Sequence, residues 1–123
     1  MLVYSQSSGV MTRDGVELAH GWAGNHEGRN NPDAQSQHCI GPLPRGMYTL
    51  QPWLPAHPHL GPITSYLKPD ESNEMFGRDA FYIHGPSVDP AKYGQESKGC
   101  IVIPRSGRLD VRDSGETTLQ VVR

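Results

Sequence analysis

Two residues of this chain are of the types that together carry nucleophilic catalysis. His84 stands in an Ile-His-Gly segment, and Cys100 follows sixteen positions later in a Ser-Lys-Gly-Cys-Ile segment. A free thiol is mostly protonated at neutral pH, so it needs a neighbouring base to take its proton. Imidazole is the side chain most often used for that task. The pair therefore predicts a cysteine nucleophile, Cys100, with His84 as its general base.

Small residues beside this pair suit the same chemistry. Gly99 leaves room for an acyl carbonyl to approach the backbone, where the amides of Gly99 and Cys100 could face a developing oxyanion. Gly85 permits a sharp turn directly after the base. Ser97 is predicted to support the oxyanion backbone or to orient His84. We therefore include Ser97 and Gly99 among the catalytic candidates, the plainer alternative being that both are turn residues.

The base must be presented by a strand, and residues 80–84, Ala-Phe-Tyr-Ile-His, predict one. They are rich in aromatic and β-branched side chains and are followed by Gly-Pro. With a period of two, Phe81 and Ile83 face one side, while Tyr82 and His84 face the other. Tyr82 is therefore a candidate substrate contact, unless it only packs on the sheet.

The composition predicts the kind of fold around this strand. Among 123 residues there are 14 Gly and 11 Pro, and only 35% are hydrophobic, which favours short strands joined by many turns over long buried helices. We expect one mostly β domain over residues 1–123, a sandwich of six to eight short strands with one or two short helices. The expected strands are 2–7, 16–23, 47–51, 63–68, 80–84 and 117–122, with a helix at 105–113 and an extended crossover at 52–62.

Charge and hydropathy exclude several classes of function. The net charge is −2 without a basic block, so nucleic acid is not an expected partner. No apolar run approaches 18 residues, so no membrane insertion is expected. The first residues lack the charged and apolar regions of a secretory signal. Any action outside the cytoplasm would then need another export route.

Neither a metal nor another cofactor is expected. His57 and His59 lie close together, and His38 precedes Cys39, but no zinc motif accompanies them. Cys39 lacks a surrounding motif and is interpreted as an idle thiol. A disulfide between Cys39 and Cys100 would consume the nucleophile, so it is not expected.

Three segments in order resemble the L,D-transpeptidase catalytic domain of the YkuD type. They are Gly28-Arg-Asn-Asn-Pro32, then Gly41-Pro-Leu-Pro-Arg-Gly-Met-Tyr-Thr-Leu50, then Ser97-Lys-Gly-Cys-Ile-Val-Ile-Pro104 after Ile83-His-Gly85. The combination is similar to the small branch of that family that includes type VI secretion effectors acting on peptidoglycan. The resemblance covers residues 20–122.

This resemblance implies an L,D-transpeptidase-like fold and a reaction on peptidoglycan stem peptides. Cys100 would attack the amide between diaminopimelate and the terminal D-Ala of a tetrapeptide stem, forming a thioester. Water would then give carboxypeptidase action, a free D-amino acid would give exchange, and another stem's amine would give a cross-link. An effector would act in the periplasm of a target cell, and a cognate immunity protein would be a further partner.

Two departures from the family pattern concern substrate binding. The usual run is Ser-His-Gly-Cys with an Arg two residues later, but this chain has Lys98 and Val102 at those positions. The missing Arg favours trimming or exchange over cross-linking, and Arg105 is a candidate substitute. Lys98 is either a contact to stem carboxylates or a solvated cation, and Gly85 and Tyr82 complete the predicted substrate-binding set.

Two other functions remain open from the sequence. The same Cys–His pair could serve a stem-peptide endopeptidase. Alternatively, the fold could be a non-enzymatic module that binds the cell wall or builds a phage structure, since a fold does not determine a function.

Overall fold

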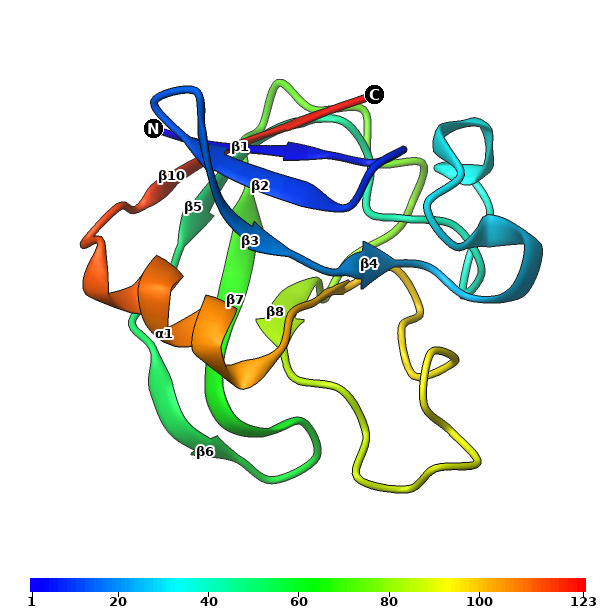
Figure 1. Ribbon diagram of the computed structural model, residues 1–123. Helices are drawn as coiled ribbons and strands as arrows, with labels where there is room; N and C mark the ends of the chain where they lie inside the picture. The colour runs from blue at the N-terminus through cyan, green and yellow to red at the C-terminus, as the bar shows by residue number, and fades with distance from the viewer.

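The computed structural model describes residues 1–123 (Figure 1). In chain order its elements are β1 (Leu2–Ser5), β2 (Val10–Arg13), β3 (Val16–His20), β4 (Trp22–Ala23), the 3₁₀ turns η1 (His26–Gly28) and η2 (Pro32–Ala34), β5 (Gly46–Leu50), β6 (Leu54–His57), β7 (Gly61–Pro69), β8 (Tyr82–His84), β9 (Ile101–Val102), α1 (Arg105–Asp113) and β10 (Thr118–Val122). The predicted mostly β fold with a short helix is confirmed.

The strands follow one hydrogen-bonded path, β3-β2-β1-β10-β5-β7-β8-β9-β4, and β6 pairs with β7 outside it. The two strands at the ends of this path, β3 and β4, are separated by Gly21 alone in the chain. The sheet therefore curls back until its edges are almost joined. Gly21 lies at this junction: it donates its N–H to the Gly9 carbonyl, just before β2, at 2.9 Å, and a Cβ on it would clash with the Val102 carbonyl oxygen of β9.

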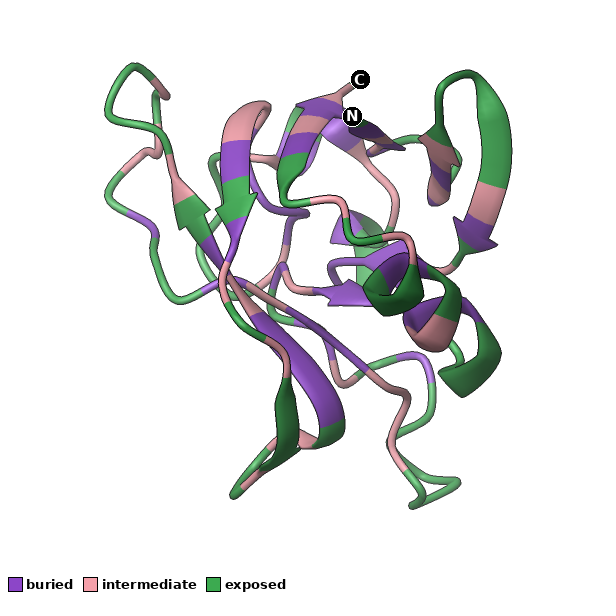
Figure 2. Ribbon diagram, turned by 90° about the vertical axis from the view of Figure 1, so that its left-hand side faces the viewer, coloured by how far each residue is buried: buried purple, intermediate pink, exposed green.

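A single cluster of sixteen buried residues fills the curled sheet. Its largest fully buried side chains include Tyr4, Tyr48 and Leu67, which come from β1, β5 and β7. Figure 2 shows buried residues along the strands and exposed residues in the loops and on β6. This core positions β8 and β9, the two short strands that flank the candidate site.

The helix at 105–113 is confirmed at the predicted residues. The extended crossover predicted for 52–62 is wrong in part, because residues 54–57 pair with β7 as the first strand of a hairpin. The proline within β6, Pro55, is tolerated because β6 is paired along one side only. The sequence prediction also missed β2, which separates β1 from β3.

Candidate active site

The parallel pairing of β8 with β9 brings the predicted nucleophile and base to one face of the sheet. Ile83 is in register with Ile101, and both are fully buried in the core. Because side chains alternate along a strand, the residues on either side of these two point to the opposite face. Cys100, which directly precedes β9, and His84, which ends β8, are thus diagonal neighbours across this pair, and no hydrogen bond joins Sγ to the imidazole in this structure.

His84 is held in the state required of a base. Its side chain is buried, and Nδ1 lies 2.8 Å from the Gly85 carbonyl oxygen. A carbonyl only accepts hydrogen bonds, so Nδ1 carries the proton and Nε2 keeps its lone pair. Burial lowers the pKa of His84, although the Gly85 bond and the Glu96 charge oppose this change. The imidazole is therefore neutral at physiological pH.

The Cys100 thiol is also neutral before any substrate arrives. Burial raises its pKa to about 11, although a hydrogen bond from the Tyr82 N–H to Sγ at 3.3 Å lowers it. Sγ also lies 3.9 Å from the Ala80 carbonyl oxygen. The resting pair is thus a thiol and an imidazole rather than an ion pair. A thiolate would form only as the proton moves to His84.

Residues 97–100 form a turn that carries Cys100, and we call it the Cys100 turn. Hydrogen bonds of Ser97 hold this turn together. Ser97 Oγ accepts the N–H groups of Gly24 at 2.9 Å and Gly99 at 3.1 Å and donates to the Cys100 carbonyl at 2.6 Å. Asn25 Nδ2 donates to the Ser97 carbonyl at 2.7 Å. Ser97 makes no hydrogen bond to His84, so its contacts shape the turn.

Arg78 also supports the Cys100 turn, and the sequence analysis did not predict this role. Its buried guanidinium donates to four backbone carbonyls, among them those of Gly41 at 2.9 Å and Lys98 at 3.1 Å. It also lies over the Phe81 ring, 5.1 Å from the centroid. No motif or spacing in the sequence marks this arginine. Its partners are carbonyls that only the fold brings together.

Gly99 is required where the turn meets Arg78. Its φ is +127°, a conformation that L side chains rarely adopt, and a Cβ would lie 2.6 Å from both Arg78 Nη2 and Phe81 Cε1. Because its N–H is donated to Ser97, it is not free for an oxyanion. The Cys100 N–H donates no hydrogen bond to another residue, and is the amide available to an oxyanion.

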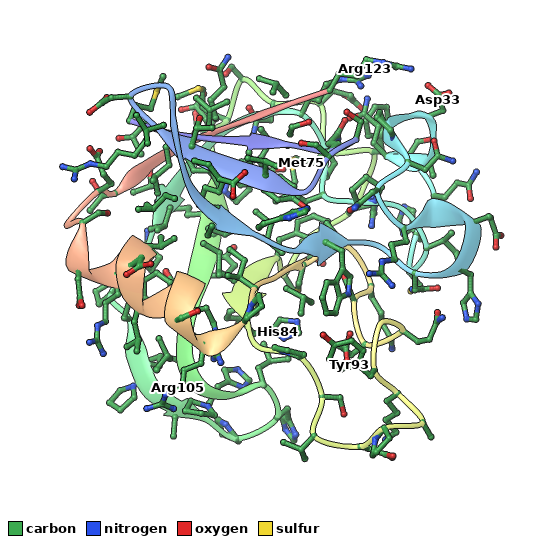
Figure 3. All side chains as sticks on the ribbon, in the orientation of Figure 1. Asp33, Met75, His84, Tyr93, Arg105 and Arg123 are labelled. Carbon is green, nitrogen blue, oxygen red and sulfur yellow. The ribbon has the colours of Figure 1, made fainter.

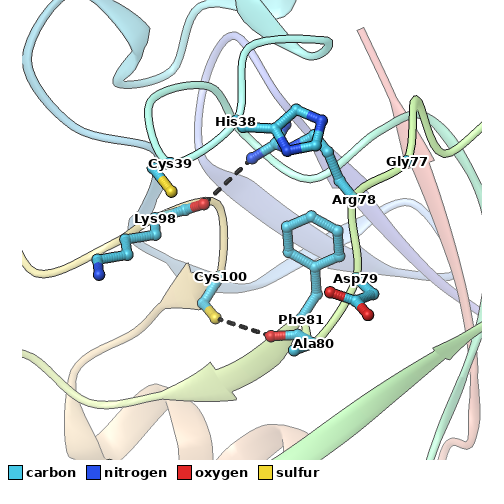
Figure 4. A pocket seen from close by; sticks show the side chains of 9 residues that line it. All are labelled: His38, Cys39, Gly77, Arg78, Asp79, Ala80, Phe81, Lys98 and Cys100. Atoms are coloured by element: carbon cyan, nitrogen blue, oxygen red, sulfur yellow. Dashed lines mark hydrogen bonds between the residues drawn. The ribbon is translucent and has the colours of Figure 1, made fainter.

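Two cavities flank the pair. The Cys100 cavity, about 250 Å³, is lined by Cys100, Lys98, Cys39, Arg78 and Phe81 among others (Figure 4). The His84 cavity, about 450 Å³, is lined by His84, Gly85, Lys92, Glu96 and Arg108 among others. A substrate amide placed between Sγ and the imidazole would therefore have space on both sides of the bond to be cut.

Comparison with known proteins adds the family to this geometry. Residues 17–123 match the model of the Tlde1 domain. The chain belongs to the Tlde1 domain family. This confirms the family to which the sequence resemblance pointed. No curated protein matches the chain.

The fold of this Tlde1 domain is that of the L,D-transpeptidases. An L,D-transpeptidase from Mycobacterium smegmatis has a TM-score of 0.52 and 14% identity over 99% of this chain and 58% of its own. The L,D-transpeptidase LdtMt1, solved in complex with imipenem, has a TM-score of 0.51 and 16% identity over 98% and 57%. The chain thus spans less than three fifths of either protein.

The other predicted substrate-binding residues of the Tlde1 domain lie in different places. Lys98 is exposed at the Cys100 cavity, and Gly85 lies in the wall of the His84 cavity. Tyr82 is half-buried, and its ring packs on Tyr66 and His57 at centroid distances of 5.3 Å. Arg105 lies exposed at the start of α1 and lines neither cavity (Figure 3).

The arginine of α1 that does reach the site is Arg108. Its guanidinium occupies the space beside Gly85, where a Cβ on that residue would lie 2.5 Å from Arg108 Nη2. Spacing on the helix explains the difference, because residues three apart differ in direction by about 60° on a helix of 3.6 residues per turn. The predicted helix contains three arginines, and only the packing of the helix decides that Arg108 is the one that lines the cavity.

The histidines and Cys39 weighed for a metal do not gather. No group of three or more metal-ligating side chains occurs in the structure. His57 Nδ1 accepts the backbone N–H groups of His59 and Leu60, and His38 Nε2 lies 2.8 Å from the Phe76 carbonyl oxygen. No helix has the length and apolarity needed to cross a membrane.

Proposed function

We propose that this protein is a cysteine enzyme that removes or exchanges the terminal D-Ala of peptidoglycan tetrapeptide stems. The observation that carries the proposal is the state of the Cys–His pair. His84 is neutral, with Nδ1 donated to Gly85, on the same sheet face as the Cys100 thiol. The family and the fold of the L,D-transpeptidases support the choice of substrate.

The first half of the reaction forms a thioester. Nε2 of His84 takes the Cys100 proton as Sγ attacks the carbonyl carbon that precedes the terminal D-Ala. The Cys100 N–H stabilises the oxyanion of the tetrahedral intermediate. The C–N bond then breaks, the amine of D-Ala takes the proton back from His84, and the stem remains bonded to Sγ. A resting neutral pair suits this sequence because the proton is transferred during attack.

The second half transfers the acyl group to water or to an amine. His84 Nε2 takes a proton from the acceptor, which attacks the thioester carbon, and the proton returns to Sγ as the C–S bond breaks. Water yields a tripeptide stem, and a free D-amino acid yields an exchanged stem. With Val102 where the family arginine would stand, we propose trimming or exchange rather than cross-linking as the main outcome.

We further propose that the enzyme acts in the periplasm, as an antibacterial effector delivered to a target cell. The Tlde1 family assignment supports this context. An immunity protein would then have to cover the Cys100 cavity or the His84 cavity, because either would admit one half of the substrate. Co-expression of the protein with its genomic neighbours in the target periplasm tests delivery and protection together.

The activity is tested by incubating purified protein with muropeptides and measuring product masses. Loss of one D-Ala, or its replacement by added D-methionine, is the expected result, and cleavage before diaminopimelate would identify an endopeptidase instead. Cys100→Ala should lose turnover by about 10³-fold or more. Cys39→Ser is the matched control, since it changes the other thiol. Equal turnover by wild type and Cys100→Ala would contradict the proposal.

A second experiment tests whether the thiol can be acylated at all. LdtMt1 was solved in complex with the carbapenem imipenem. Incubation of this protein with imipenem should add one drug mass to the intact protein, and Cys100→Ala should prevent the addition. His84→Ala should slow the addition near pH 7, and an unchanged rate would contradict its role as base.

A further inference from the structure

Arg108 is a buried cation without a counter-ion. Only 6% of its surface is exposed, and no carboxylate forms an ion pair with it. Its Nη1 donates to the carbonyls of Pro62 and Ile63, but Nε is buried without a hydrogen-bond partner, and Nη2 has none in the protein. Burying a charge in this way is costly unless a negative group completes the site.

The charged residues that line the His84 cavity give it a net positive charge. Lys92 lines it, as does Arg108. The single carboxylate, that of Glu96, already accepts the Ser87 and Gly94 N–H groups, both at 2.8 Å. Burial, and then the charge of Arg105, lower the pKa of Arg108, which agrees with a cation that lacks a negative partner. The cavity is thus suited to an anion.

The proposed reaction indicates which anion would enter the His84 cavity. His84 must return its proton to the amine of the leaving amino acid, so that amine lies next to the imidazole. In an α-amino acid the carboxylate is bonded to the same carbon as the amine. Because His84 and Arg108 line the same cavity, the carboxylate of the leaving group would enter the space in front of the Arg108 guanidinium.

We propose that Arg108, assisted by Lys92, binds the α-carboxylate of the amino acid that leaves or enters at His84. This inference rests on the proposed function and adds to it the direction in which the substrate lies across the site. The acyl half lies in the Cys100 cavity, and the free amino-acid half lies in the His84 cavity. The enzyme therefore selects stems whose last residue has a free carboxylate, and acceptors that are free amino acids.

The same residues serve both directions of exchange. In the forward step the C–N bond breaks, the amine gains the His84 proton, and the carboxylate stays ionised against Arg108. In the reverse step an entering amino acid binds by its carboxylate, its amine loses one proton to His84 Nε2, and a new C–N bond replaces the C–S bond. No oxidant, metal or further reactant is required.

The test compares two stems that differ only at the carboxylate. One tetrapeptide ends in D-Ala and the other in D-alaninamide, and the release of each terminal amine is measured by mass spectrometry. Wild type should release D-Ala about tenfold faster or more, the effect of losing one charge-assisted hydrogen bond. Arg108→Gln should slow release of D-Ala and bring the two rates together. Arg112→Gln, an exposed arginine of the same helix, should keep the wild-type ratio.

Other results would overturn the inference. Equal rates for the two stems in wild type, or an unchanged ratio in folded Arg108→Gln, would show that Arg108 does not read the carboxylate. If Arg108→Gln does not fold, as judged by circular dichroism, Lys92→Ala in the 85–96 loop replaces it and should reduce the ratio in part. An unchanged ratio in Lys92→Ala would then contradict the site.

Failure of the proposed reaction would be seen separately. If neither stem is cut, D-alanine and D-alaninamide are titrated into ¹⁵N-labelled Cys100→Ala protein, and the Gly85 amide resonance is followed. A shift with D-alanine alone, lost in the Cys100→Ala, Arg108→Gln double variant, would uphold the carboxylate site without the proposed reaction. Equal shifts, or none, would overturn the site as well.

Discussion

The Cys100 turn and the 85–96 loop follow one another in the chain and are held in different ways. The Cys100 turn receives hydrogen bonds from Asn25, Arg78 and Gly24, which come from distant parts of the sequence, and those from Asn25 and Gly24 are buried. The 85–96 loop is held mainly by hydrogen bonds within itself, among them the two N–H groups that Glu96 accepts and the Lys92 N–H donated to the Asp89 carbonyl.

The Cys100 turn is also less exposed to solvent than the 85–96 loop. Ser97 and Gly99 are buried, whereas Val88 is fully exposed and Tyr93 is 57% exposed. The Tyr93 ring contacts Trp22 at a centroid distance of 5.4 Å, one of the few contacts from the 85–96 loop to the body of the protein. Few buried contacts mean a low cost of local opening. The turn that carries Cys100 is thus fixed in advance, while the wall of the His84 cavity formed by the 85–96 loop can open at a lower cost.

Matched glycine substitutions give the largest test of this difference. Gly99 and Gly94 both have positive φ, but a Cβ at Gly99 meets the packed Phe81 ring, whereas at Gly94 it meets only the far end of the Arg29 side chain, at 2.8 Å. Gly99→Ala should lower the free energy of unfolding by about 3 kcal/mol or more, and Gly94→Ala by about 1 kcal/mol. Urea denaturation measures both. Equal losses would remove the distinction between the two segments.

Asn25 provides a smaller test of how the Cys100 turn is supported. Its Nδ2 donates at 2.7 Å to the carbonyls of Ser97 and Cys39, and the side chain is buried. Asn25→Ala leaves these acceptors without that donor and should cost about 2 kcal/mol in thermal or urea unfolding. Asn31→Ala removes two solvent-exposed hydrogen bonds, the cap of η2 and the bond from Nδ2 to the Glu27 carbonyl, and should cost about 1 kcal/mol or less. A reversed order would contradict the support we assign to Asn25.

The pH dependence of alkylation tests the buried state of the nucleophile. In a Cys39→Ser background, iodoacetamide reacts with Cys100 alone, and only its thiolate reacts. Because burial raises the pKa of Cys100 to about 11, the rate should rise about tenfold for each pH unit from 7 to 10. Intact mass against time measures it. A plateau below pH 9 would show that the resting thiol is not desolvated.

The smallest expected effect is that of substituting Glu96, which tests whether the 85–96 loop influences the pKa of His84. The Glu96 charge raises the pKa of His84 against the larger effect of burial. Glu96→Gln should therefore lower the pKa of His84 further. An NMR titration of the His84 ring protons measures the change. A rise in that pKa would contradict the electrostatic assignment.

Much of the fold followed from local patterns. The helix at 105–113 is preceded by Pro104 and followed by Gly115, and the alternation in residues 80–84 assigns Phe81 and Ile83 to the core, as found. The strand β6 was missed because Pro55 within it, and Pro52 and Pro58 on either side, suppress the local strand signal. Its partner β7 supplies the pairing, and a pairing partner is not a property of residues 54–57 alone.

The sequence by itself determined which residues could do chemistry, because a Cys–His pair flanked by glycines leaves few other interpretations. Only the tertiary structure decided where these side chains lie and which protonation state each one has. The register of β8 against β9 places both side chains on one face, and burial fixes their protonation. The arginines Arg78 and Arg108 acquire their roles from carbonyls and a cavity contributed by distant segments. Such contacts depend on packing in three dimensions, which local spacing does not encode.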